Sequence, residues 1–340
     1  MDADIYLYAV SGDMRRFMKN QRVLRAIVPF LAFIACLANS SVGLAAEQHA
    51  HSAQVTSCIQ NGWNPLHIQV TGNDREMLWK RPRGKWKRGA IVILHGGGGS
   101  HYQFCTGGKL VRPQIEFAEA AVEEGFAVFL LDSTDGVVTD AKGNNCGKRF
   151  DFSVLDRSNA DLAFVGKVIK KTIPQLRSSR SSKKIFLTGL STGGYMAIRA
   201  AVRFNNKITA FAPVSAGDPY GTWTNCDARL SKRKSAKGIL LDLETNKPIT
   251  AKGACSSNNY PNEKDWPRFK SKRRPAFKQF HNRGDAIVDI SCMKKVQHQL
   301  QQHGYVNKGE FVLDSDRRRV LNHLWLKRYN DAILEFFKSQ

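Results

Sequence analysis

The sequence predicts an α/β fold in which helices cover both faces of a mostly parallel β-sheet. Short, wholly apolar segments recur along the chain, as is typical of strands that are buried on both faces. Segments with helical periodicity lie between them at the spacing of βαβ units. The chain has 340 residues, 42% of them hydrophobic and 24% charged, so one large domain with a sizeable core is expected.

A hairpin is expected at the start of this domain. Residues 67–70 and 75–79 have strand character, and the sequence TGND at residues 71–74 is a good turn between them. The other expected strands are residues 90–94, 127–131, 185–188, 208–212, 276–280 and 310–313.

Besides the helix that follows residue 191, four helices are expected between and after these strands. They are residues 114–124, 156–173, 290–302 and 322–338. Pro174 is expected to end the second helix, because proline lacks an N–H and clashes with the preceding turn. Only the segment from about 215 to 275 breaks the alternation, and we expect an insertion or lid there, beside the carboxyl ends of the strands where such a sheet places its ligand site.

The first 46 residues have the pattern of a secretory signal peptide. A basic stretch from Met14 (MRRFMKNQRVLR) precedes the apolar run AIVPFLAFIACLA, and SVGLAA ends it in small residues, so cleavage is expected after Ala45 or Ala46. Because residues 1–13 precede the basic stretch, Met14 or Met18 is the expected start of the chain. The apolar run is too short for a transmembrane span, so the mature catalytic domain, residues 47–340, is predicted to be secreted or periplasmic.

The mature chain keeps an even number of cysteines, which in an exported protein predicts up to three disulfides. They are Cys58, Cys105, Cys146, Cys226, Cys255 and Cys292. Their spacing does not choose among the pairings, and the absence of a C-x-x-C pair argues against a structural zinc site. Cys36 lies in the signal, and a lipoprotein anchored there is the alternative to free secretion.

The formal net charge of +23 predicts attraction to anionic surfaces or polymers. The basic residues occur in short runs at 80–88, 232–237, 270–274 and 317–319. These runs fit either a solvated surface or a dedicated polyanion site. No nucleic-acid motif accompanies them, and export argues further against nucleic acid as a partner.

Ser191 is the expected nucleophile. It is central in GLSTG, between the apolar strand IFLT and the helical sequence YMAIRAAVRF. A serine on a sharp strand-to-helix turn needs small residues two positions away on either side, because the backbone passes too close for larger ones. A plain glycine-rich turn is the alternative, and the strand and helix around it favour the nucleophile.

A serine hydroxyl needs a base and an orienting acid to be reactive. His323 and Asp285 follow Ser191 in the chain order Ser, Asp, His of the G-x-S-x-G hydrolases. In that scheme His323 accepts the proton of Ser191, and Asp285 holds the imidazole in the useful tautomer. Asp289 is the alternative acid, and the other histidines of the C-terminal half are His281, His298 and His303.

The oxyanion that forms during acyl transfer needs hydrogen-bond donors. Four successive glycines after His95 allow backbone N–H groups to approach a substrate closely. Gly97 is the expected donor of this loop, with Gly96 and Gly98 as alternatives, and Thr192 N–H is the second donor. A phosphate-binding loop is disfavoured, because no Lys-Ser/Thr follows the glycines.

These residues resemble the α/β-hydrolase superfamily, and more closely the secreted polyhydroxybutyrate depolymerase and feruloyl or acetylxylan esterase group. The resemblance runs from about residue 72 to the C-terminus, and it rests on IVILHG at 91–96, NADLAFV at 159–165, GLSTGG at 189–194, APVS at 212–215, the segment from Phe280 to Val288 with Asp285, and His323 with Trp325. It implies a serine esterase that cleaves carboxylic esters without a metal or other cofactor.

Two departures leave the ester substrate open. Asp289 and Leu326 stand where members of this group often have proline, in loops that contact substrate. A peptidase on the same scaffold is the nearest alternative enzyme. An exported protein that binds polyanions without catalysis is the alternative from another class.

Overall fold

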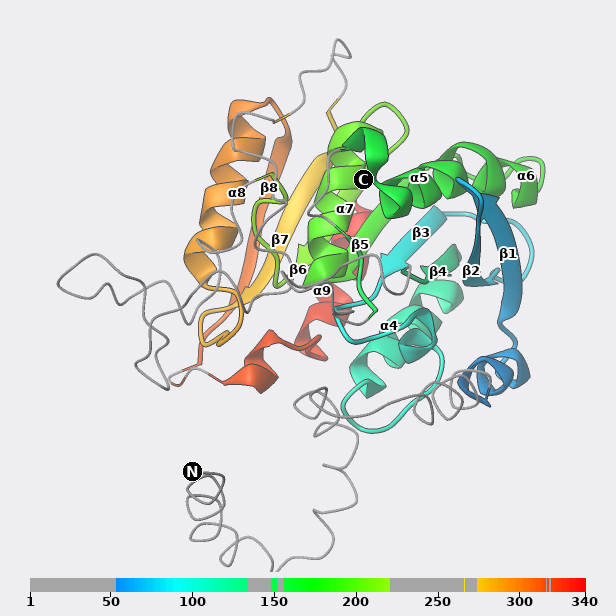
Figure 1. Ribbon diagram of the computed structural model, residues 1–340, viewed down its shortest axis with the longest axis horizontal. Helices are drawn as coiled ribbons and strands as arrows, with labels where there is room; N and C mark the ends of the chain where they lie inside the picture. The colour runs from blue at the N-terminus through cyan, green and yellow to red at the C-terminus, as the bar shows by residue number, and fades with distance from the viewer. Residues whose placement is uncertain are drawn as a thin grey trace, which may run out of the picture. The chain divides into compact units, whose positions relative to one another are not determined.

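An eight-stranded sheet runs through the part of the chain that the computed structural model describes (Figure 1). The described residues are 53–133, 148–151, 156–220, 266, 274–315, 317 and 319–340, all within the compact unit Ala53–Gln340. The predicted signal peptide, most of the predicted insertion, Cys146, Cys226 and Cys255 lie outside them.

The strand order of the sheet is β1-β2-β4-β3-β5-β6-β7-β8. The strands are β1 (Asn64–Val70), β2 (Asn73–Lys80), β3 (Gly89–Leu94), β4 (Phe126–Leu131), β5 (Ile185–Leu190), β6 (Ala210–Val214), β7 (Ala276–Asn282) and β8 (Val306–Leu313). β2 pairs antiparallel with β1 and β4, and every other pairing is parallel. The predicted hairpin and the mostly parallel sheet are therefore confirmed.

Helices cover both faces of this sheet, as the sequence predicts. They are α4 (Arg112–Glu123), α5 (Ala160–Lys167), α6 (Ile173–Leu176), α7 (Thr192–Arg203), α8 (Ile290–Gln302) and α9 (Arg328–Lys338). Short helical turns occur at η1 (His101–Phe104), η2 (Asp156–Ser158), η3 (Val168–Thr172) and η6 (Val320–His323), and a further helix spans 53–60. Figure 1 shows α5, α7 and α8 on one side of the sheet and α4 and α9 on the other.

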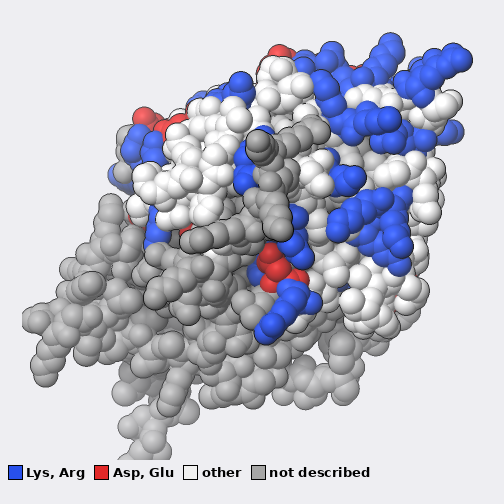
Figure 2. All heavy atoms as spheres, turned by 90° about the horizontal axis from the view of Figure 1, so that it is seen from above, with Lys and Arg blue, Asp and Glu red and all other residues white. Residues whose placement is uncertain are grey.

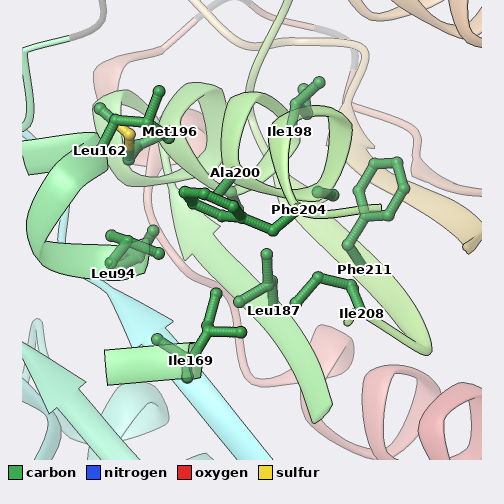
Figure 3. Close-up of a cluster of buried hydrophobic side chains, with 14 of the residues drawn as sticks. Leu94, Leu162, Ile169, Leu187, Met196, Ile198, Ala200, Phe204, Ile208 and Phe211 are labelled. Carbon is green, nitrogen blue, oxygen red and sulfur yellow. The ribbon is translucent and has the colours of Figure 1, made fainter. Parts of the chain in front are cut away.

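Alternation along the strands feeds two hydrophobic cores, one on each face. Val92 and Leu94 of β3 belong to the core beneath α5, α7 and α8, whereas Ile91 between them belongs to the core beneath α4 and α9. Figure 3 shows Leu94 with Met196 and Ala200 of α7 in the first core. Burying each such side chain stabilises the fold by about 1.5–3 kcal/mol, so the two cores hold the carboxyl ends of the strands in place.

The predicted helix over 156–173 is wrong in its extent and in its end. α5 begins only after Asn159, whose side chain accepts a hydrogen bond from Leu162 N–H at 2.7 Å. Pro174 does not end the helical run, because the π-helical turn η3 intervenes: Ile173 N–H donates to Val168 O, five residues back. Pro174 thus falls in the first turn of α6, where a missing N–H is tolerated.

The predicted start of the last helix at residue 322 is also wrong. α9 begins at Arg328, and His323 ends the separate turn η6, after which Leu324 is extended. This break leaves His323 between β8 and α9, at the end of the short turn η6 and outside α9.

One of the disulfides expected from the even cysteine count joins Cys58 to Cys105. It ties the helix at 53–60 to the chain just after η1. Cys292 is buried in α8. No helix among the described residues is long and apolar enough to cross a membrane.

Candidate active site

Ser191 occupies the sharp turn between β5 and α7. Its backbone has φ +52° and ψ −119°, a region that residues other than glycine rarely adopt and one in which strain collects at functional sites. Ser191 N–H donates to Val214 O at 2.9 Å, which ties the turn to the end of β6. The side chain therefore lies at the carboxyl edge of the sheet, at the N-terminus of α7.

The glycines around Ser191 are required by the backbone that surrounds them. A Cβ atom on Gly189 would lie 2.6 Å from the carbonyl carbon of Gly193, and one on Gly193 would lie 2.3 Å from Leu94 O. Real Cβ atoms essentially never come so close to backbone. The spacing G-x-S-x-G is thus a packing requirement of this turn, where β5, α7 and β3 meet.

Asp285 and His323 form a buried pair at the same edge of the sheet. Asp285 Oδ2 lies 2.8 Å from His323 Nδ1, and Asp285 Oδ1 accepts from the backbone N–H groups of Ile287 at 2.7 Å and Val288 at 2.9 Å. Burial alone raises the pKa of Asp285, but His323, His281 and the backbone donors outweigh it and lower that pKa below its usual range. Asp285 is therefore a carboxylate near neutral pH, and its hydrogen bond with His323 Nδ1 leaves Nε2 as the ring nitrogen that can serve as a base.

The other acid and the other histidines occupy different positions. Asp289 caps α8, where its side chain accepts from Ser291 N–H at 2.9 Å. His281 Nε2–H donates to Val288 O at 3.0 Å and lies 3.7 Å from Asp285 Oδ2. Burial chiefly lowers the pKa of His281, and the hydrogen bond of its ring to Val288 O supports the turn that carries Asp285. His303 stacks on Trp266, and His298 lies on α8.

Topology brings Ser191 to the same edge as the Asp285–His323 pair. Ser191, Asp285 and His323 follow β5, β7 and β8, and the carboxyl ends of parallel strands meet at one edge. Backbone hydrogen bonds link these ends in order: Ser191 N–H donates to Val214 O, and Ser215 N–H after β6 donates to Phe280 O of β7 at 2.9 Å.

The glycine loop after β3 lies against the start of α7. A Cβ atom on Gly97 would lie 3.5 Å from Thr192 Cγ2. Gly98 N–H donates to Lys148 O at 2.9 Å and Gly99 N–H to Gly96 O at 3.0 Å, whereas no described residue accepts from Gly97 N–H. Thr192 N–H is in the first turn of α7, where helix donors lack intrahelical partners. Gly97 therefore lies against Thr192 at the start of α7.

Asp132 and Ser133, directly after β4, hold the two ends of the glycine loop. Asp132 Oδ1 accepts from Ser100 Oγ–H at 2.9 Å, and Ser133 N–H donates to His95 Nε2 at 3.1 Å. His95 Nδ1–H in turn donates to Gly96 O at 2.8 Å. Asp132 is not among the site residues predicted from the sequence. Its position at the end of a buried strand, at the same carboxyl edge as Ser191, was the available signal.

His101 completes this buried cluster. Its Nδ1 lies 3.3 Å from Asp132 Oδ2, and its Nε2 lies 3.7 Å from Glu76 Oε1. The ligand atoms of Glu76, His101 and Asp132 lie within 4.8 Å of one another, which is a spacing that suits a metal ion. Lys148 Nζ already contacts Asp132, however, and His101 bears a positive charge, so the cluster is balanced by protein cations.

Because His101 is charged in the folded protein, we expect the free energy of unfolding to depend on pH. Burial disfavours the imidazolium, but the carboxylates of Asp132 and Glu76 outweigh burial and raise the pKa of His101 from 6.5 to about 9. A raised pKa gives stability that is full below pH 6.5 and is lost as the pH rises through about 9. The wild type should therefore lose up to about 3 kcal/mol more unfolding free energy than His101→Gln between pH 6 and pH 10. Urea titrations at both pH values measure this, and parallel pH profiles of the two proteins would contradict it.

The strand order, the antiparallel second strand, the serine turn after β5 and the Asp–His pair after β7 and β8 define the α/β-hydrolase fold. The sequence matches no model of a known protein family and no curated protein. The structure is similar to that of an arylesterase, with a TM-score of 0.53 and 15% identity over 82% of this chain and 84% of that one. That likeness supports the fold.

Two further solved structures have a TM-score of 0.49. An esterase from Pyrococcus furiosus is 20% identical, over 82% of this chain and 92% of that one. An acylaminoacyl peptidase from Pyrococcus horikoshii is 16% identical over 81% of this chain, which spans only 41% of the peptidase.

Proposed function

We propose that this protein is an exported serine hydrolase that cleaves carboxylic esters through an acyl-enzyme on Ser191. The observation that carries the proposal is the buried Asp285–His323 hydrogen bond, at the sheet edge where Ser191 occupies its positive-φ turn. The Cys58–Cys105 disulfide supports export, since disulfides persist in oxidising compartments. The predicted signal peptide supports it too.

In the proposed reaction, His323 Nε2 takes the proton from Ser191 Oγ as this oxygen attacks the ester carbonyl. His323 then gives the proton to the departing alcohol, which breaks the C–O bond and leaves the acyl group on Ser191. A water molecule repeats the sequence and releases the acid. The Asp285 carboxylate fixes the imidazole tautomer and stabilises the imidazolium in both halves.

The carbonyl oxygen becomes negatively charged in both tetrahedral intermediates. Gly97 N–H and Thr192 N–H are the proposed donors to it, because Gly97 lies against Thr192 and no described residue accepts from Gly97 N–H. The positive end of the α7 dipole adds to this stabilisation. Donors fixed before the reaction need no reorganisation during it, and such donors are worth the most.

Ester and amide probes test the proposed activity directly. The purified full chain is expected to hydrolyse 4-nitrophenyl acetate, butyrate or octanoate, and to act on methyl ferulate or acetylated xylan, with rates that define the preferred acyl group. Matching 4-nitroanilides should react at least about 100-fold more slowly, because amines are poorer leaving groups. Faster cleavage of the amides would establish a peptidase. No hydrolysis, together with salt-dependent binding to a polyanion, would establish a non-catalytic binding protein.

Asp132→Asn tests the support of the glycine loop. The amide keeps an oxygen acceptor for Ser100 but removes the charge that holds His101 and Lys148. We expect kcat to fall about 10- to 100-fold with little change in KM, because a slightly displaced donor weakens transition-state binding. The exposed Asp74→Asn is the control and should change neither constant. A lower unfolding temperature with unchanged kcat would contradict the role of Asp132.

A further inference from the structure

A surface cavity of ≈ 310 Å³ lies on the loop between β8 and the proposed catalytic histidine. It is lined by Ser315, Arg317, Arg319 and Asn322. Among the described residues, the lining includes two arginines and no acidic side chain. The two guanidinium groups therefore offer paired N–H donors and positive charge, which suit a carboxylate or a phosphate.

Both arginines are exposed and line this cavity. Among the described residues, no carboxylate forms an ion pair with Arg317 or Arg319. Arg283 nearby differs, because its guanidinium binds Asp314.

Hydrogen bonds fasten this loop to the turn that carries Asp285. Arg319 N–H donates to Gly284 O at 2.9 Å, and Asn322 Nδ2 donates to Gly284 O and Arg317 O, each at 3.0 Å. A Cβ atom on Gly284 would lie 2.6 Å from Arg317 O, so the two segments are in close contact. The segment that carries the two arginines is thus held against the Asp285 turn, and it directly precedes the turn η6, which ends at His323.

We infer that Arg317 and Arg319 bind a carboxylate of the substrate, so that this hydrolase prefers esters that carry an anionic group away from the bond that is cleaved. This inference rests on the proposed esterase activity and names its substrate class. A guanidinium can bind a carboxylate through two parallel hydrogen bonds, which positions the ester as well as attracting it. The basic surface acts in the same direction: Figure 2 shows that Lys and Arg cover far more of the visible face than Asp and Glu, and such a surface steers anionic substrates inward.

The preference is measured as the ratio of kcat/KM for 4-nitrophenyl monosuccinate to that for the neutral 4-nitrophenyl butyrate. The double variant Arg317→Gln/Arg319→Gln should lower this ratio about 10-fold, mainly through KM of the monosuccinate, because one charge-assisted hydrogen bond is worth about that factor. Arg83→Gln/Arg112→Gln removes the same charge from exposed positions elsewhere and should leave the ratio within about two-fold of the wild type.

The two possible failures give different results. An unchanged ratio in a double variant that still hydrolyses the butyrate ester overturns the anion site and leaves the esterase standing. Failure of the wild type to hydrolyse either ester overturns the esterase itself.

A parallel comparison of acetylated oligogalacturonate with acetylated xylo-oligosaccharide identifies the source of the carboxylate. If the double variant loses the preference for both the monosuccinate and the acidic oligomer, the arginines recognise a single carboxylate on a small substrate. If it loses the preference for the acidic oligomer alone, the arginines recognise an acidic polymer.

Discussion

Ser191→Ala is expected to lower kcat/KM for activated esters by at least about 10³-fold, because the acyl-enzyme cannot form without the hydroxyl. Alanine fits the turn sterically as well as serine does, and the fold should therefore survive. Steady-state hydrolysis of 4-nitrophenyl butyrate measures the activity, and urea unfolding measures the stability.

Ser215→Ala is the matched control for this change. Ser215 also has a positive φ, +51°, directly after a strand, and it is fully buried. The structure gives it no part in the reaction, so its variant should keep kcat/KM within a few-fold. Equal rates for wild type and Ser191→Ala would show that the hydrolysis does not pass through this serine.

Asp285→Asn is expected to lower kcat by about 10⁴-fold with little change in KM. Asparagine retains the shape but presents an N–H₂ group or a neutral oxygen to His323 Nδ1, which favours the wrong tautomer and removes the charge that stabilises the imidazolium. Because the pKa of Asp285 is lowered, the wild-type carboxylate is ionised at neutral pH, and its contribution to stability is lost only as the pH falls through that lowered value. Kinetics at pH 8 measure the catalytic effect.

Asp289→Asn is the control for the acid. Asp289 caps α8, and asparagine is an equally good N-cap. The free energy of unfolding should therefore stay nearly the same, and kcat should change by no more than about two-fold. A large loss in this variant, with activity retained in Asp285→Asn, would assign the acid to Asp289 instead.

The local features of the site could be predicted from the sequence because local sterics impose them. The turn at Ser191 admits only glycine at positions 189 and 193, since a Cβ at either would meet backbone of neighbouring segments. The buried strands could also be predicted, because both of their faces are covered and their sequences are continuous apolar runs.

Features that depend on distant contacts, and local breaks in a helix that the sequence pattern does not mark, could not be predicted in this way. The Cys58–Cys105 pairing joins residues 47 positions apart, and spacing alone does not select it. Asp132 takes its place in the site from its contact with Ser100 across the sheet edge. The π-helical turn before Pro174 and the late start of α9 are likewise local departures from a helical pattern that the sequence continues without a break.

Covalent labelling with a fluorophosphonate tests the central claim most directly. The reagent phosphonylates an activated serine with loss of fluoride, and peptide mass mapping then identifies the residue. One adduct for each chain, on Ser191, is predicted, with labelling slowed at least about 100-fold in His323→Ala, because the base that activates the hydroxyl is gone. An adduct on another residue, or no adduct on a folded protein, would contradict the assignment of Ser191 as the nucleophile.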